Sequence, residues 1–330
     1  MTYLIYLIHP YYYYTFMRND TIHRLRRLSQ LLFILLIIFA PVLDIFRFDV
    51  DTRSLIVFGN EWDLGLKEGF YTGRSFQDSS HVAWQFFLKA ILPWIGILAL
   101  FPILGVITGR FFCGWSCPEG ALFELFDFLT VKVFGRRGLF TKQLNDPEGP
   151  SKHRILYGAL ALFCMFVIPL FGGIMLTGYF VNPATVWNQV MNREFSFGVK
   201  AGITGVALYM FISSMIIRHT LCKYVCSAGL MMMMFGWVSP VSVRIKADED
   251  RLGFCTDCKS CEKACFMNVK PRGFASRKNI NCVNCGECIE ACRKELGADR
   301  GIFSFTNSGI SSLPAGEIRD KIRSKLIHAK

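Results

Sequence analysis

Two cysteine runs near the C-terminal end constrain the fold more than any other feature of the chain. Both have the spacing Cys-x2-Cys-x2-Cys-x3-Cys, and they consist of Cys255, Cys258, Cys261 and Cys265, and of Cys282, Cys285, Cys288 and Cys292. This is the spacing of a bacterial ferredoxin with two clusters. A 4Fe-4S cluster needs four soft thiolates that converge from several directions. The runs therefore predict a protein that moves electrons.

The spacing also predicts which cysteines share a cluster, because the fourth cysteine of each run ligates the neighbouring cluster. We expect one 4Fe-4S cluster on Cys255, Cys258, Cys261 and Cys292, and a second on Cys282, Cys285, Cys288 and Cys265. The crossing makes the two runs one folding unit. Two intact runs also indicate a reducing, cytoplasm-facing compartment, where thiols act as ligands and not as disulfides.

Ahead of the runs, the sequence is too apolar for an ordinary soluble enzyme. The 330 residues are 52% hydrophobic, with a mean hydropathy of +0.35. Stretches long enough to cross a hydrocarbon core of about 30 Å lie at residues 31–46, 84–108, 155–177 and 201–217. We expect an α-helical integral membrane protein, with four transmembrane helices in two hairpins and a cytoplasmic α+β ferredoxin domain.

The distribution of Lys and Arg predicts the orientation. Basic residues outnumber acidic ones in residues 18–27, 110–154 and 218–330, whereas acidic residues prevail in 47–78. Because basic loops stay on the cytoplasmic side, we expect both termini and the ferredoxin domain in the cytoplasm, with the chain in the inner membrane. The formal charge of +12 comes from these segments, and no basic stripe is interleaved with aromatic residues, so no nucleic-acid partner is indicated.

These patterns predict five segments. They are an N-terminal cytoplasmic or interfacial segment at 1–28, the membrane domain at 29–227, an interfacial amphipathic segment at 228–246, the ferredoxin domain at 247–305 and a tail at 306–330. A fifth crossing at 228–243 would place the clusters outside, against the charge distribution. The four methionines at 231–234 offer thioethers for Cu(I), but consecutive residues point all round a helix, which favours packing.

A second pair of cysteine motifs lies at the predicted inner ends of the second and fourth crossings. Cys113 and Cys117 form one Cys-x3-Cys motif, and Cys222 and Cys226 form the other. In a helix this spacing places both sulfurs on one face. Arg110 and Arg218, just upstream of the pairs, are expected to favour the thiolate form.

The equivalent placement of the pairs indicates an internal repeat, and such repeats commonly build a shared site at their interface. The site could hold a third iron-sulfur cluster, bind copper or act as exchanging dithiols, and the plain alternative is that the pairs are incidental. Cys164 has no partner by spacing and is expected to pack as a small hydrophobe. No Cys-x-x-Cys-His motif and no Gly-rich nucleotide fingerprint occurs, which indicates no attached haem, NAD or flavin.

Together the motifs resemble those of membrane polyferredoxins of the NapH, NosR and CcoG type. The resemblance covers about residues 24–307 and includes Cys113 to Pro118, Cys222 to Cys226 and both ferredoxin runs. Within this group the sequence is most similar to the cytochrome oxidase accessory protein CcoG. The supporting stretches are Phe58-Gly59-Asn60-Glu61-Trp62 and Arg300-Gly301-Ile302.

The sequence departs from the group's pattern at Ser227, Phe266 and Arg293, each of which replaces a proline that usually follows a cysteine ligand. Proteins resembling CcoG also continue into a further crossing and an immunoglobulin-like domain. This sequence has instead a short basic segment, expected to be helical around residues 317–326. No cysteine ligand is lost.

The resulting expectation is a membrane-anchored iron-sulfur protein that passes electrons between a membrane-side partner and a cytoplasmic ferredoxin domain. The resemblance to CcoG implies a cupric reductase that serves respiratory oxidase assembly. The resemblance to NapH and NosR implies a quinol dehydrogenase component that donates to a terminal reductase. A redox-sensing iron-sulfur protein is a further alternative.

Overall fold

The computed structural model describes residues 21–50, 54–62, 84, 87–138, 150–248, 251–272, 280–297 and 299–306. The predicted N-terminal interfacial stretch up to residue 20, and the predicted helix at 317–326, lie outside this part. The chain forms two compact units. We call them the cysteine unit, within residues 1–31, 102–154 and 219–330, and the helical unit, within residues 32–101 and 155–218.

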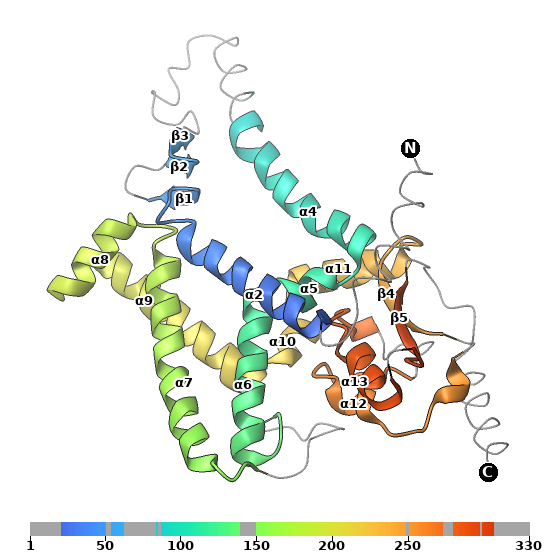
Figure 1. The fold of residues 1–330 in the computed structure, drawn as a ribbon. Helices are drawn as coiled ribbons and strands as arrows, with labels where there is room; N and C mark the ends of the chain where they lie inside the picture. Colours follow the sequence, from blue (N-terminus) through green and yellow to red (C-terminus); the bar gives the residue numbers. More distant parts are fainter. Residues whose placement is uncertain are drawn as a thin grey trace. The chain divides into compact units, whose positions relative to one another are not determined.

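The helical unit contains two helices long and apolar enough to cross a membrane. They are α7 (Arg154–Thr177) and the continuous helix Phe197–Ile217, which comprises α9 (Phe197–Ile212) and the π-helical turn η2 (Ser213–Ile217). The short α8 (Pro183–Asn192) connects them (Figure 1). A Cβ on Gly173 would lie only 2.7 Å from the Ile203 carbonyl oxygen, so the glycine permits a close helix crossing.

The first predicted crossing is placed differently. Helix α2 (Thr21–Phe39) begins ten residues earlier than the predicted stretch and ends before Phe46, which starts a strand. The antiparallel sheet that follows has the order β1 (Phe46–Asp49), β2 (Ser54–Val57) and β3 (Asn60–Trp62). Phe58 and Gly59 form the tight β2–β3 turn with positive φ, and the apolar helix ends ahead of this sheet, sooner than hydropathy predicts.

The second predicted crossing is helical over residues 87–108. It comprises the π-helical turn η1 (Phe87–Ile91) and α4 (Leu92–Thr108), while residues 85–86 lie outside the described part. Arg154–Thr177 and Phe197–Ile217 meet the length and hydropathy expected of a span, whereas the apolar part of α4 from Leu98 to Thr108 is shorter. The number of crossings therefore stays a prediction.

In the cysteine unit, a short helix and a longer one occur twice in the same order. The first pair is α5 (Phe111–Trp115) and α6 (Pro118–Phe134), and the second is α10 (His219–Tyr224) and α11 (Ser227–Val238). Pro118 starts α6 at a position where its missing N–H costs nothing, and Gly135 ends it in the left-handed conformation. The predicted repeat thus appears in the local structure.

The predicted amphipathic segment is the helix α11, and it packs on the end of α4. A Cβ on Gly105 would lie 2.9 Å from the Cα of Met232, and the Ser239 hydroxyl donates to the Val106 carbonyl oxygen at 2.7 Å. Met232 is completely buried, whereas Met234 is 62% exposed. The methionines therefore point in different directions, as packing predicts, and do not gather around one ion.

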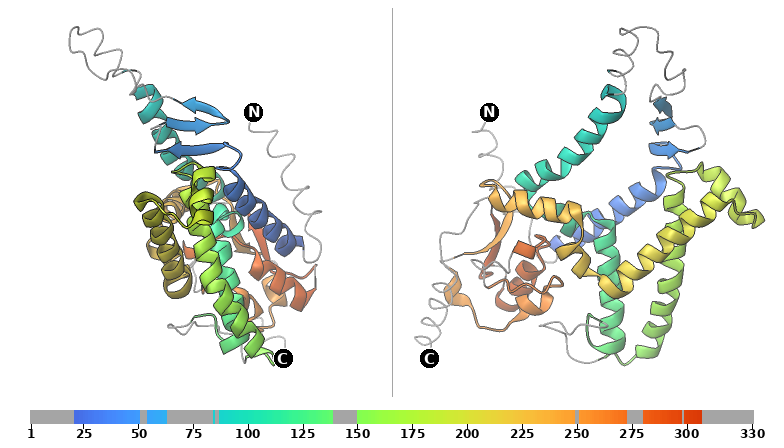
Figure 2. Two further views of the ribbon diagram at one scale, coloured as in Figure 1. Left: turned by 90° about the vertical axis from the view of Figure 1, so that its left-hand side faces the viewer. Right: turned by 180° about the vertical axis from the view of Figure 1, so that it is seen from behind.

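The ferredoxin part combines a two-stranded sheet with short helices. β4 (Arg244–Ala247) pairs antiparallel with β5 (Phe303–Thr306), and α12 (Ser260–Ala264) and α13 (Glu287–Leu296) lie beside them (Figures 1 and 2). A 3-10 turn, η3 (Leu252–Phe254), precedes the first cysteine run. The hydrophobic core of this part contains both apolar side chains and cysteines. They include Ile245, Leu252, Ile289, Ile302, Phe303, Cys261, Cys288 and Cys292.

Candidate functional site: three groups of cysteines in one unit

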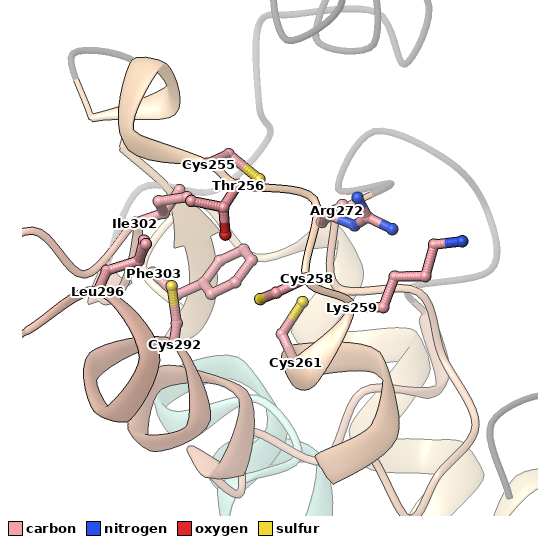
Figure 3. A pocket seen from close by; sticks show the side chains of 10 residues that line it. All are labelled: Cys255, Thr256, Cys258, Lys259, Cys261, Arg272, Cys292, Leu296, Ile302 and Phe303. Atoms are coloured by element: carbon pink, nitrogen blue, oxygen red, sulfur yellow. The ribbon is translucent and has the colours of Figure 1, made fainter. Parts of the chain in front are cut away.

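The first group of cysteines lines a pocket between α12, α13 and the loop after η3. Its thiols belong to Cys255, Cys258, Cys261 and Cys292, and their sulfur atoms face a common space (Figure 3). Leu296, Ile302 and Phe303 give the pocket an apolar floor, and Arg272 lies at its rim. The last cysteine of the second run thus enters the pocket of the first run, the combination that crossed ligation requires.

Both runs reach this geometry through the same backbone conformation. The third and fifth residues of each run have positive φ, at Asp257 and Lys259 in one run and at Asn284 and Gly286 in the other. A left-handed residue turns the chain sharply, so the cysteines on either side point inward. The fifth residue of each run is also the N-cap of the helix that follows it. Lys259 caps α12, which carries the third cysteine of the first run, and Gly286 caps α13, which carries the third and fourth cysteines of the second run.

The second group comprises Cys265, Cys282, Cys285 and Cys288, and burial dominates its electrostatics. Burial raises the pKa of Cys282 to about 11 and the pKa of Cys285 well above the usual thiol value, with further increases from the neighbouring Cys265 thiol. Buried thiols of this kind bind a metal only when they lose their protons. Cys265 raises the pKa of all three other thiols, and it packs in one hydrophobic cluster with Cys285, so this group is assembled from both runs.

The third group is made by the two Cys-x3-Cys pairs, and we call it the four-cysteine site. Burial raises the pKa of the Cys222 thiol, and repulsion from Cys117, Cys113 and Cys226 raises it further. The four residues come from two segments of the sequence more than a hundred residues apart, joined where Arg110 Nη2 donates to the Cys222 carbonyl oxygen at 2.6 Å. The structure therefore brings together the two pairs that the repeat predicted.

The local geometry of each pair differs from the prediction. Cys113 and Cys222 lie in the short helices α5 and α10, whereas Cys117 and Cys226 are extended N-cap residues of α6 and α11. The two sulfurs of a pair do not share one helical face, because the helix ends between them. In the first pair this break is stabilised by an N-cap hydrogen bond, because Cys117 Sγ accepts the Gly120 N–H at 3.5 Å.

Arg110 favours the thiolate form of Cys113, as the sequence predicts, but burial has the larger effect on the pKa of this thiol. Burial raises the pKa of Cys113, and the nearby positive charge of Arg110 lowers it by a smaller amount. Burial raises the pKa of Cys117 to about 11. Arg218 belongs to the helical unit, where its Nε donates to the Ser214 carbonyl oxygen at 2.9 Å. At Cys113 desolvation outweighs the Arg110 charge because the thiol is buried.

The spread of the sulfur atoms limits what the four-cysteine site can hold. In the described part of the chain, no three cysteine sulfurs lie within 4.8 Å of one another. A single tetrahedral ion with metal–sulfur bonds of 2.3 Å would draw thiolates to about 3.8 Å from each other. A cubane accepts thiolates farther apart, because each binds a different iron. The described cysteines of the ferredoxin runs likewise have no three sulfurs within 4.8 Å, so both kinds of cysteine group are compatible with a cluster.

The four-cysteine site and the second ferredoxin group touch through their backbones. A Cβ on Gly114 would lie 2.3 Å from the Val283 carbonyl oxygen and 3.2 Å from the Cα of Cys285. Beside it, the indole Nε1 of Trp115 donates to the Asn284 carbonyl oxygen at 3.0 Å. The residue after Cys113 is thus packed directly against the loop of the second run. Sequence reasoning gave Gly114 no role, although glycine beside a ligand cysteine is a signal of close backbone approach.

A buried ionic network, which the sequence did not reveal, surrounds these groups. Arg26 of α2 is 1% exposed and binds both carboxylate oxygens of Glu124 at 3.0 and 2.6 Å. It also pairs with Glu287 of α13 at 2.9 Å, and its guanidinium lies over the Phe266 ring. One side chain therefore links α2, α6 and the ferredoxin helices. His23, Glu287 and Glu290 bring their ligand atoms together, but Arg26 and Lys294 already neutralise these carboxylates.

A buried His–Asp pair also packs against Phe266. His219 Nε2 and Asp127 Oδ2 are 2.8 Å apart, and the imidazole packs on the Phe266 ring with centroids 5.0 Å apart. The pair joins α10 to α6 three residues before Cys222. It therefore fixes the helix that carries a site cysteine.

Comparisons with known proteins agree with an iron-sulfur assignment. A model described as a 4Fe-4S binding domain matches residues 90–137, which contain Cys113 and Cys117. The chain is 26% identical over 196 residues to the putative electron transport protein YccM of Escherichia coli, and the match covers 59% of this chain and 52% of YccM. No solved structure matches the chain.

Two further relatives have ferredoxin-type names. The ferredoxin-type protein NapH of Haemophilus influenzae is 26% identical over 219 residues, covering 63% of this chain and 68% of NapH. The methylamine utilization ferredoxin-type protein MauN of Methylorubrum extorquens is 27% identical over 241 residues, covering 73% of each chain. The chain spans about half the length of YccM. These matches show similarity to proteins with electron-transport and ferredoxin-type names, while the narrower resemblance to CcoG stays a prediction.

Proposed function

We propose that this chain is a membrane-anchored electron-transfer protein, in which electrons pass between the four-cysteine site and two 4Fe-4S clusters of the ferredoxin part. The observation that carries the proposal is the contact of Gly114 with Val283 and Cys285. It leaves no space for another side chain between the backbone beside Cys113 and the loop of the second ferredoxin group. Short, packed paths of this kind are what electron transfer between protein-bound centres needs.

The ferredoxin part would hold its clusters on the two crossed sets. Cys255, Cys258, Cys261 and Cys292 are the ligands of one, and Cys265, Cys282, Cys285 and Cys288 are the ligands of the other. When bound, such clusters supply reversible one-electron chemistry. The protein contributes the inward-facing thiols, the apolar cover and the Arg272 side chain, which pairs with Glu262 at 2.9 Å beside the first pocket.

For the four-cysteine site we propose a third iron-sulfur cluster. The matched 4Fe-4S binding domain includes Cys113 and Cys117, and the described cysteine sulfurs are not gathered as tightly as the four ligands of a single tetrahedral ion. Exchanging dithiols are less suited to thiols whose pKa burial raises, because thiolate is the attacking species.

The membrane anchor would comprise α7 and the helix Phe197–Ile217, whose apolar side chains are mostly exposed in the chain by itself. Exposed apolar helices of this length are suited to lipid. With α2 and α4 as the other two crossings, the charge distribution keeps both cysteine motifs and the ferredoxin part in the cytoplasm, against the inner membrane.

The partner at the membrane side would be quinol or Cu(II), the two electron-exchange partners that the resemblance implies. Quinol would make the chain a donor to a terminal reductase, and Cu(II) would make it a cupric reductase in oxidase assembly. A redox sensor would need no such partner. The relatives named above carry electron-transport and ferredoxin-type names, and these names do not mention copper.

The test is anaerobic purification of the full chain, followed by iron analysis and electron paramagnetic resonance. Three clusters correspond to about twelve irons per chain. A variant with serine at Cys113, Cys117, Cys222 and Cys226 should lose about a third of the iron, whereas Cys164→Ser, in the middle of α7, should lose none. Adding quinol or Cu(II) then shows which one changes the cluster spectra. Full iron content in the fourfold variant would overturn the assignment of a cluster to the site.

A further inference from the structure

We infer that Arg110 sets the reduction potential of the centre at the four-cysteine site, by donating N–H groups of a buried guanidinium to the anionic sulfur atoms of that centre. The inference rests on the cluster proposed for that site. It adds a specific binding residue that the cysteine spacing does not identify.

The first observation is the burial of a charge without a full set of partners. Arg110 is 3% exposed, and its Nη2 donates to the Cys222 carbonyl oxygen at 2.6 Å. Its Nε and Nη1 are buried and have no hydrogen-bond partner among the residues that the structure describes. Guanidinium groups present five donors and remain charged, so leaving them unpaired in a buried position is unfavourable. A ligand with negative acceptors would remove that cost.

The second observation is where the guanidinium lies. The charge of the guanidinium lowers the pKa of the Cys113 thiol. A Cβ added to Gly229 would lie 3.2 Å from Arg110 Nη2 and 3.7 Å from the Cβ of Cys226, so the guanidinium is also near the second pair. The guanidinium therefore lies between the two cysteine pairs. Gly229 leaves room for it, since a larger residue would crowd this position. On another side the fully buried Met232 closes the site, with its Sδ 3.8 Å from Cys113 Sγ.

The chemistry of the unpaired donors distinguishes between occupants. Neutral thiols are weak acceptors, so reduced and protonated cysteines would leave the Arg110 donors unsatisfied. Four thiolates and the sulfides of a cluster carry net negative charge and accept charge-assisted hydrogen bonds. When such a centre takes up one electron, its negative charge grows by one. The Arg110 charge favours this reduced form, and hydrogen bonds to cluster sulfurs act in the same direction.

Arg244 provides the matched control. It belongs to the same unit, is partly buried and also binds backbone carbonyls, those of Gly236 and Trp237. Burial lowers its pKa, and no cysteine contributes to the shift. Arg244→Gln therefore removes a similar group without removing a charge from the four-cysteine site.

The experiment is a mediated redox titration of the purified full chain in detergent, followed by electron paramagnetic resonance, with iron analysis of every sample. We expect Arg110→Gln to keep the iron and to make reduction of one of the three centres at least tenfold less favourable, a negative shift of about 59 mV or more for one electron. Arg110→Lys keeps the positive charge but loses the planar set of guanidinium donors, so it should shift the potential of that centre less. Arg244→Gln should leave all three potentials unchanged.

The outcomes separate this inference from the proposed function. If the wild-type chain contains iron for two clusters only, the third cluster itself is wrong. If three are present and Arg110→Gln leaves every potential in place, the role of Arg110 is wrong. If Arg110→Gln loses the iron of one centre, Arg110→Lys must retain it and show the smaller shift. Loss of that iron in both variants would make Arg110 a structural residue and overturn the inference.

Discussion

The ferredoxin runs and the four-cysteine site use the same ligand type but are built in opposite ways. Each ferredoxin run makes its inward turns locally, through left-handed residues at Asp257, Lys259, Asn284 and Gly286. The four-cysteine site instead joins two distant short helices, and its geometry depends on the packing of α5 against α10 and on Arg110. A local motif can be recognised from spacing, whereas an assembled site depends on residues outside the motif.

The charges around the two kinds of site also differ. Arg272, at the rim of the first ferredoxin pocket, pairs with Asp257 and Glu262. Arg110, in the four-cysteine site, is buried, and two of its nitrogen atoms have no hydrogen-bond partner within the described part of the chain. An arginine already neutralised by carboxylates adds little field at a cluster, whereas an unneutralised one adds much. The four-cysteine site should therefore be the more sensitive of the two to loss of its arginine.

The largest effect is expected from Cys265→Ala, which tests crossed ligation within the ferredoxin part. Because Cys265 would ligate the cluster formed mainly by the second run, its loss should remove that cluster, about a third of the iron. Iron analysis and the reduced-state spectrum measure this, with Cys164→Ala as the control. A wild-type spectrum at full iron content would show that the second run binds its cluster without Cys265.

A smaller but still large effect is expected from Arg26→Ala, which breaks a long-range ion pair that no cysteine spacing predicts. Removing one partner of a buried ion pair leaves Glu124 uncompensated, at a cost of about 3–5 kcal/mol. Arg27→Ala is the matched control, because Arg27 pairs with the same carboxylate at 3.0 Å but is 44% exposed, and should cost about 0–1 kcal/mol. Denaturant unfolding of both variants measures the difference. Equal losses would mean that the buried network does not stabilise the unit.

Gly114→Ala tests the contact between the two kinds of site. The added Cβ would lie 2.3 Å from a backbone oxygen that cannot rotate away, so the segments must separate, at a cost of about 1–3 kcal/mol. We expect weaker magnetic coupling between the centres and slower electron exchange, with unchanged iron content. Gly158→Ala, in a helix with open space around the glycine, should change neither property. Unchanged magnetic coupling in Gly114→Ala would show that this contact is not part of the electron path.

The smallest effect is expected from Gly229→Ala, which tests the role of Arg110 in the comparison with Arg272. The new methyl group would approach the Arg110 Nη2 at 3.2 Å, and a flexible guanidinium end can move by a few tenths of an ångström. We expect a negative shift of one potential, smaller than that of Arg110→Gln, in the same redox titration. A shift as large as that of Arg110→Gln would indicate that Gly229 acts on the centre by another route.

The sequence predicted the elements that depend on short-range patterns. Residues 155–177 and 201–217 are helical and long enough to span, and the two Cys-x3-Cys motifs occupy equivalent positions in a repeated pair of helices. Hydropathy placed the end of the first crossing too far along, because α2 ends at Phe39, just ahead of Pro41, and Phe46 already belongs to a strand paired with β2. The helical face expected for each cysteine pair was also wrong, because Cys117 and Cys226 cap the next helix.

By itself, then, the sequence determined the kind of ligand, the ferredoxin spacing and the existence of a repeat, since these follow from residue type and from distances of a few positions along the chain. Only the tertiary structure decided which distant groups meet. Gly114 against Val283, Arg26 between Glu124 and Glu287, and Arg110 between the cysteine pairs all join residues roughly a hundred or more positions apart. Such contacts depend on how helices pack, and no local pattern of the chain encodes the partner of a buried side chain.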